Sequence, residues 1–182
     1  MSEELVIRCC APTLASIKTG SMFVCPFADK AEMGRSLSGW NRRLKDKGLR
    51  VLPLRYRDGR GLIWLYRPSQ LARDLEKEAA RDILRECGYS LDGSAGLIAQ
   101  LLGRVRRCDG FPHEIGLFLG YPPADVDGFI HRHDECRLVG AWKVYSDVDR
   151  ARLTFDRFKR CTRICLDRWQ RGVPLERFTV AA

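Results

Sequence analysis

The sequence predicts a single α+β domain over residues 1–182, with a small antiparallel or mixed sheet of three to five strands, helices packed on one face and an αα-corner. Two regions alternate apolar and polar residues with the period of a strand. Other segments repeat apolar residues at helical spacing, and Phe111–Ile130 has the proline and glycine positions of two helices joined by a tight turn. Strands confined to two regions among several helices are typical of α+β proteins.

The first part of the chain predicts helices followed by a hairpin. Pro12 separates two short apolar runs, and Asp58-Gly59 joins two strand-like runs, which is a strong hairpin signal. Pro53 places its strand at a sheet edge, because proline cannot donate a ladder hydrogen bond. The expected elements are helices at Glu3–Cys10 and Thr13–Ile17, a strand at Ser21–Cys25, a helix through Leu37–Leu44 that stops at Gly48, and strands at Leu49–Tyr56 and Leu62–Arg67.

The second part predicts mostly helices. Ser69, Ser94 and Asp147 are residue types that favour helix starts, and Gly88 and Gly172 favour helix ends. The expected elements are a helix from Ser69 to Gly88, a helix from Ser94 to Val105, the corner, a strand at Leu138–Tyr145 placed against the hairpin, a helix from Asp147 to Trp169, and an edge strand at Leu175–Val180.

The composition is that of a chain with a core large enough for one domain. Hydrophobic residues make up 45%, but no stretch approaches the roughly 20 apolar residues of a membrane span. The N-terminal MSEELVIRCC lacks the basic and long apolar regions of a signal peptide. We therefore expect a cytoplasmic protein with no membrane partner.

The eight cysteines fall inside apolar helical and strand patterns, and no C-x-x-C occurs. In a reducing cytosol such cysteines are mostly small buried hydrophobic residues. Cys10 lies close to an expected helix end, where a lowered pKa would make a thiol reactive. It is therefore kept as a catalytic candidate beside the simpler interpretation that it is buried.

Charge and the corner both raise the question of nucleic-acid binding. The formal charge of +9 would attract phosphates, and the corner has the spacing of a helix-turn-helix. However, its second helix carries Asp125 and Asp127, which would meet base edges and phosphates with negative charge. Nucleic-acid binding is therefore disfavoured without being excluded.

His113 and Glu114, at the start of the corner, are candidates for catalysis. Imidazole and carboxylate groups both bind first-row metals and both transfer protons near neutral pH. In the simpler alternative, the carboxylate complements the helix dipole and the histidine bonds a loop carbonyl. His131, His133 and Cys136 are weaker metal candidates, because adjacent residues of a turn cannot all face one ion.

Two further segments carry groups suited to an anion. Lys18, Thr19 and Ser21 offer an ammonium and two hydroxyls before a strand, without the remaining residues of a Walker loop. In the strand that ends at Tyr145, alternation places Lys143 and Tyr145 on the same face. We expect His113 to face the same cavity as Lys143 or Tyr145, although an ordinary turn and a solvated strand face are the simpler explanations of these residues.

Four segments are long and specific enough to identify relatives: CAPTLASIKTGSMF, KGLRVLPLRYRDGRGLIWLYRP, FPHEIGLFLGYPPADVDGFI and RLVGAWKVYSDVDRA. Together they resemble a family of small cytosolic proteins of unknown function from anaerobic bacteria, and the resemblance covers nearly the whole chain. It implies no established activity, cofactor or catalytic residue. It associates the family with flavodoxin and iron-uptake genes.

The leading hypothesis is therefore a cytosolic binding or accessory protein with a pocket for an anionic small molecule or a redox cofactor, linked to iron or flavodoxin metabolism. Whether the protein is an enzyme stays open, and no cofactor is assigned. The alternatives are a nucleic-acid-associated protein and a protein-interaction module with a flavodoxin-like partner.

Overall fold

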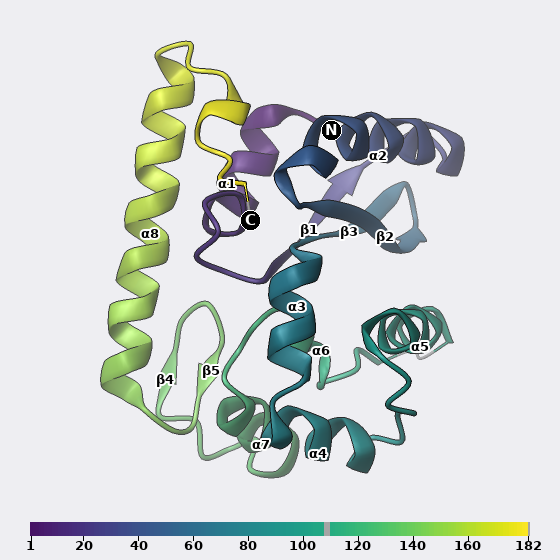
Figure 1. Cartoon of the computed structure of the whole chain (residues 1–182), viewed down its shortest axis with the longest axis vertical. Coiled ribbons are helices and arrows are strands. Elements are labelled where there is room, and N and C mark those ends of the chain that lie inside the picture. The colour runs from purple at the N-terminus through teal and green to yellow at the C-terminus, as the bar shows by residue number, and fades with distance from the viewer. Residues whose placement is uncertain (108–109, 182) are drawn as a thin grey trace. The chain divides into compact units, whose positions relative to one another are not determined.

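The computed structural model describes residues 1–107 and 110–181 (Figure 1). The chain divides into two compact units, residues 1–69 with 158–182 and residues 70–157, and each is described by itself. Two such units are compatible with one domain, so the single domain stays a prediction. No helix of the described ranges is both long and apolar enough to cross a membrane.

The fold is α+β, as predicted. The helices are α1 (Glu3–Leu14), α2 (Lys30–Leu44), α3 (Pro68–Leu75), α4 (Glu78–Glu86), α5 (Ser94–Arg107), α6 (Ile115–Phe118), α7 (Pro123–His131) and α8 (Val148–Gln170), with 3₁₀ turns η1 (Lys45–Lys47) and η2 (Leu175–Arg177). The strands are β1 (Gly20–Pro26), β2 (Arg50–Arg57), β3 (Arg60–Tyr66), β4 (Leu138–Val139) and β5 (Lys143–Val144).

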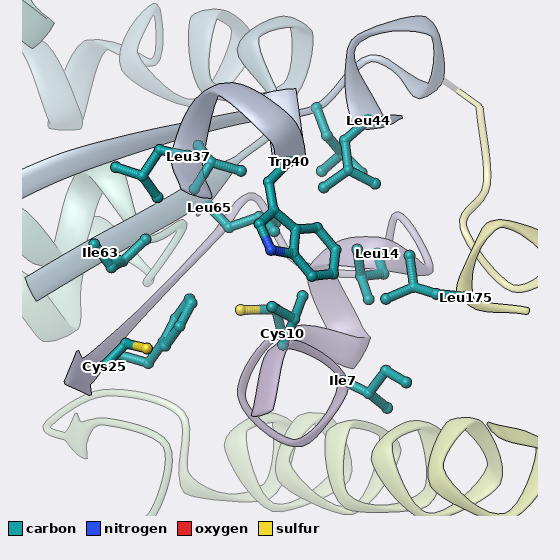
Figure 2. Close-up of a cluster of buried hydrophobic side chains, with 14 of the residues drawn as sticks. Ile7, Cys10, Leu14, Cys25, Leu37, Trp40, Leu44, Ile63, Leu65 and Leu175 are labelled. Atoms are coloured by element: carbon teal, nitrogen blue, oxygen red, sulfur yellow. The ribbon is translucent and has the colours of Figure 1, made fainter. Parts of the chain in front are cut away.

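The first unit is built on an antiparallel sheet with the strand order β1-β3-β2. Helix α1 packs against β1 and β3, and α2 packs against β2. The two helices cover the sheet face that carries Phe23, Ile63 and Leu65, so helices pack on one face as expected. Figure 2 shows Trp40 of α2 and Cys10 of α1 among the buried side chains of this core.

The hairpin and its edge position are both confirmed. Asp58 and Gly59 have φ values of 51° and 71°, the left-handed conformations that a two-residue hairpin turn needs. Strand β2 lies at the edge, where Pro53 removes a backbone donor. The Asn41 side chain accepts from the Val51 N–H and donates to the Val51 carbonyl, each at 2.8 Å. This amide therefore occupies backbone groups that an added strand would need.

Arg67 joins three separate parts of the first unit from a fully buried position. Its guanidinium donates to the carbonyls of Thr13 (2.7 Å), Leu14 (2.7 Å), Lys47 (3.2 Å) and Val180 (2.7 Å). The first two belong to the last turn of α1, where carbonyls lack helical partners and the helix dipole favours a cation. A residue distant in sequence thus caps α1, which has no basic residue in its own last turn.

In the second unit, a buried carboxylate likewise joins segments that are separate in the sequence. Asp125 of α7 accepts hydrogen bonds from Trp142 Nε1 (2.7 Å), the Tyr145 N–H (2.9 Å), and both the N–H (2.9 Å) and the hydroxyl (2.7 Å) of Ser146. Burial alone would raise the pKa of Asp125, but these bonds outweigh it and hold the pKa below its ordinary value. Asp125 therefore faces the β4–β5 hairpin and is not presented to solvent, contrary to the sequence prediction.

The αα-corner is confirmed, with Gly120 at φ 77° between α6 and α7. Leu117, Phe118 and Leu119 are all buried, as expected for a packed corner. Its first helix is only four residues long and begins at Ile115, so Pro112 does not open it as predicted. A helix this short disfavours the helix-turn-helix interpretation, in which a full first helix crosses the DNA backbone.

Four other expected elements differ from the structure. Helix α1 continues through Pro12, because a proline near a helix end removes a single hydrogen bond and α1 buries its apolar stripe. The predicted Ser69–Gly88 helix is two helices, α3 and α4. Residues Leu138–Tyr145 form a separate two-stranded hairpin and do not join the main sheet, because Asp125 holds them. The Leu175–Val180 segment contains η2 in place of an edge strand.

Arg67→Lys is expected to lower the free energy of unfolding by about 3 kcal/mol, because one ammonium cannot reach four carbonyls that the planar guanidinium serves. Denaturant unfolding monitored by circular dichroism measures this change. Arg60→Lys is the control, since Arg60 is an exposed residue at the end of β3. Equal and small changes in both variants would show that the four hydrogen bonds contribute little.

Candidate functional site

In the first unit, the predicted residues surround the end of α1 and the start of β1. The Thr13 and Ser21 hydroxyls are hydrogen bonded at 2.9 Å, and the Thr19 carbonyl accepts from the Arg67 N–H at 2.9 Å. Cys10 is fully buried, and burial raises the pKa of its thiol well above the ordinary value. The thiol stays protonated at neutral pH, which favours its interpretation as a core residue.

Lys18 has an unusual environment for an ammonium group. Its Nζ lies 6.0 Å from the centroid of the Phe158 ring, and burial lowers the pKa of Lys18 to about 8 from an ordinary 10.5. The nearby Cys10 acts in the opposite direction and only partly offsets burial. A substantial fraction of this amine is therefore neutral in mildly alkaline solution.

Glu114 is a structural residue of the second unit in this arrangement. Its buried Oε1 accepts from the Tyr89 hydroxyl at 2.9 Å and lies 3.7 Å from the Arg104 guanidinium. Arg104 also stacks over the Tyr89 ring at 4.1 Å. Burial, reinforced by the Glu114 charge, raises the pKa of Tyr89, so the tyrosine remains a hydrogen-bond donor. Glu114 is thus fully engaged and points away from solvent.

His113 and Lys143 both lie against the ring of Phe129. That they face one cavity stays a prediction. The His113 ring is edge-on to Phe129 with centroids 4.9 Å apart, and Lys143 Nζ lies 5.3 Å from the Phe129 centroid. His133 packs against the same ring at 5.1 Å, and its Nε2 is 3.4 Å from Lys143 Nζ. We call His113, Phe129, His133 and Lys143 the Phe129 cluster.

The cluster has hydrogen-bonding capacity to spare. Among the residues that the structure describes, no carboxylate lies within 4.0 Å of Lys143 Nζ, and the His113 ring makes no hydrogen bond. The expected alternative, that His113 bonds a loop carbonyl, finds no support within those residues. His133 Nδ1 lies 3.5 Å from Asp134 Oδ1, a carboxylate next to the cluster.

Other predicted residues support or flank the cluster. Tyr145 is buried, and its hydroxyl donates to the His133 carbonyl at 3.1 Å. His131 bonds Asp127 and Glu86, both at 3.0 Å, and the first of these bonds raises the pKa of His131. The Cys136 thiol donates to the Leu138 carbonyl.

No metal site is assembled from these side chains. In residues 1–107 and 110–181, no three His, Cys, Asp or Glu side chains are grouped as metal ligands. The ring nitrogens of His131 are both turned to carboxylates, and His133 faces Lys143, whose positive charge would repel a cation. The Phe129 cluster is suited to an anion instead.

Sequence analysis missed the residue at the centre of the cluster. Phe129 lies between His113 and His131 in the sequence, and no helical spacing links it to His133, because α7 ends at His131. The local pattern therefore carried no signal for this residue. Asp125 was also missed as an organiser, because an aspartate near a helix start is ordinarily explained by the helix dipole.

Gly128→Ala is expected to destabilise the protein by about 1 to 3 kcal/mol, because a Cβ there would overlap the Tyr145 ring. The displaced tyrosine would also release the His133 carbonyl. Gly34→Ala in α2 is the matched control, since its Cβ would meet nothing and should stabilise by about 0.5 to 1 kcal/mol. Thermal unfolding that ranks both variants alike would contradict the packing at Gly128.

The low pKa of Lys18 predicts a pH-dependent stability difference. Between about pH 8 and pH 10 the unfolded chain keeps a proton on Lys18 that the folded protein has lost, so raising the pH favours the folded state. Relative to Lys18→Met, the wild type should therefore gain about 2 to 3 kcal/mol over this range. The cysteine contributions cancel in the comparison. A difference independent of pH in urea unfolding would show that Lys18 titrates normally.

Comparison with known proteins supplies a family. No curated protein and no solved structure matches the chain. The model of the family described as proteins of unknown function, DUF3793, matches residues 6–179 and so covers both units, including every candidate residue above. The chain therefore belongs to the DUF3793 family.

Proposed function

We propose that the protein binds an anionic small molecule, with a phosphate or carboxylate group, at the Phe129 cluster. One observation carries this proposal: donors from three separate segments converge on one aromatic ring, and among the described residues no carboxylate pairs with Lys143. His113 comes from the turn before α6, His133 from the turn after α7, and Lys143 from β5. Convergence from different segments is what a specific anion site requires.

The chemistry of the cluster fits a small anion. Lys143 supplies a full positive charge with donors beyond the one directed at His133. His113 is exposed and can donate from a ring nitrogen whether neutral or protonated. Phe129 is half-buried and gives all three groups an apolar neighbour, beside which a charge-assisted bond is stronger than in open water. This supports a binding role and requires no catalytic step.

A carboxylate near the cluster sets a limit on the ligand. Asp134 Oδ1 lies 3.5 Å from His133 Nδ1, so a bound anion is expected to approach from the side of His113 and Lys143. A compact anion avoids this charge more easily than a large polyanion. We therefore favour a single phosphate or carboxylate group over an extended acidic partner at this position.

Imidazole NMR tests the proposal, because the chain has three histidines and two of them belong to the cluster. Titration with inorganic phosphate at neutral pH and constant ionic strength should shift the ring signals of His113 and His133. His131 is the internal control, since both of its ring nitrogens already face carboxylates. Equal shifts in all three histidines, or none, would contradict the proposal.

Lys143→Met should weaken phosphate binding by about 1 to 3 kcal/mol, the usual contribution of a hydrogen bond to a charged group. His113→Gln keeps a donor at a similar position and should weaken binding less than Lys143→Met. If Lys143→Met binds phosphate with unchanged affinity in the same NMR titration, the cluster does not hold the anion.

A further inference from the structure

The positive charge of the protein is confined to one of its two units. Residues 1–69 with 158–182 contain 19 Lys and Arg against 8 Asp and Glu, a net +11, whereas residues 70–157 contain 13 against 15, a net −2. The second unit balances its arginines with acidic residues, and the first unit does not.

Part of this excess is exposed on the solvent face of α2. The buried stripe of this helix is Met33, Leu37, Trp40 and Leu44. Arg35 and Arg42 are seven residues apart, so they lie on the same side of the helix, opposite that stripe and about 10 Å apart along its axis. No acidic residue occurs between them in the sequence.

Both guanidinium groups are available for a partner. Within the described part of the chain, neither Arg35 nor Arg42 has a carboxylate within 4.0 Å. Together with Ser36, Gly39, Trp40 and Arg43 they line a shallow depression of about 470 Å³. Arg43 differs from its neighbours, because it holds Glu3 at 2.5 Å and Glu176 at 2.7 Å and stacks over the Trp40 ring at 4.7 Å.

The residues around the two arginines are small. Gly34 and Gly39 are interior residues of α2, where each glycine lowers helix stability by about 1 kcal/mol relative to alanine. A Cβ at Gly34 would meet nothing, so core packing does not require that glycine. Because the side chains beside Arg35 and Arg42 are small, a partner can approach the helix closely.

We propose that this face of α2 binds the phosphate backbone of duplex nucleic acid without sequence preference. The proposal concerns the first unit and does not rest on the anion site at Phe129. Arginine suits the role because its planar fork makes two parallel bonds to a phosphate. Backbone contacts of this kind supply affinity and position, and they do not read sequence.

The surface favours a duplex over an acidic protein or a single strand. Among the described residues, the large hydrophobic side chains that are exposed are Val24, Val139, Leu153, Ile164 and Val180. None of them is on α2 and none is aromatic. A protein interface needs a buried apolar anchor, and single strands stack their bases on exposed aromatic rings. Trp40, the aromatic residue of the depression, is buried with Arg43 over its ring, so this face offers neither feature.

Fluorescence anisotropy tests the proposal with labelled duplexes. Two unrelated DNA duplexes and an RNA duplex of equal length should show salt-dependent binding, and the two DNA sequences should bind equally well. Comparing DNA with RNA shows which duplex is the better partner. Preference for the single strand of the same length would overturn the proposal, as would a failure to bind any duplex at about 50 mM salt.

The decisive variant is Arg35→Gln with Arg42→Gln, which should weaken duplex binding roughly tenfold at about 50 mM salt and reduce the slope of log affinity against log salt by about two. Arg150→Gln with Arg152→Gln is the matched control, because it removes the same charge from exposed positions in the second unit. An equal loss in both double variants would mean that only net charge matters and would overturn the proposal. Phosphate shifts at His113 and His133 should be the same in both variants.

Discussion

A buried guanidinium with no carboxylate partner among the described residues organises the first unit. Removing Arg67 from water is costly, and the cost is tolerable only because four carbonyls converge on it. That requirement fixes the end of α1, the turn before β2 and the C-terminal segment around one group. The Arg67 N–H also bonds the Thr19 carbonyl, so the Lys18–Ser21 segment takes its position from the same residue. The hydrogen bond to Arg67 explains the polar groups of this segment no less well than a bound ligand would.

The second unit is organised by a buried charge of the opposite sign. Asp125 is a buried anion that collects N–H and O–H donors, whereas Arg67 is a buried cation that collects carbonyls. Each charge is satisfied mainly by segments distant in sequence, so each acts as a tertiary constraint and not as a local cap. Asp125 fixes β5 against α7, and this is what places Lys143 beside Phe129. The geometry of the Phe129 cluster therefore depends on a carboxylate that is not part of it.

Much of the fold was predictable because its signals are local. The hairpin turn at Asp58-Gly59 and the corner glycine at Gly120 both adopt the left-handed conformations that their sequence indicates. The failures occur where distant contacts decide the outcome. Burial of α1 outweighs the loss of one hydrogen bond at Pro12, and the bonds to Asp125 hold residues 138–145 away from the main sheet. Neither competition is visible in a local pattern.

The same distinction applies to function. Residue type was enough to select His113 and Lys143, but the sequence could not show that they share Phe129, because that requires the placement of α7 against β5. Net charge was a poor guide for the converse reason: the value of +9 is the sum of +11 on one unit and −2 on the other. Attraction of a polyanion depends on charge near the surface that it meets, because salt screens charges beyond roughly 10 Å. The proposed anion site and the proposed duplex-binding face therefore belong to different units, and neither proposal requires the other unit's charge.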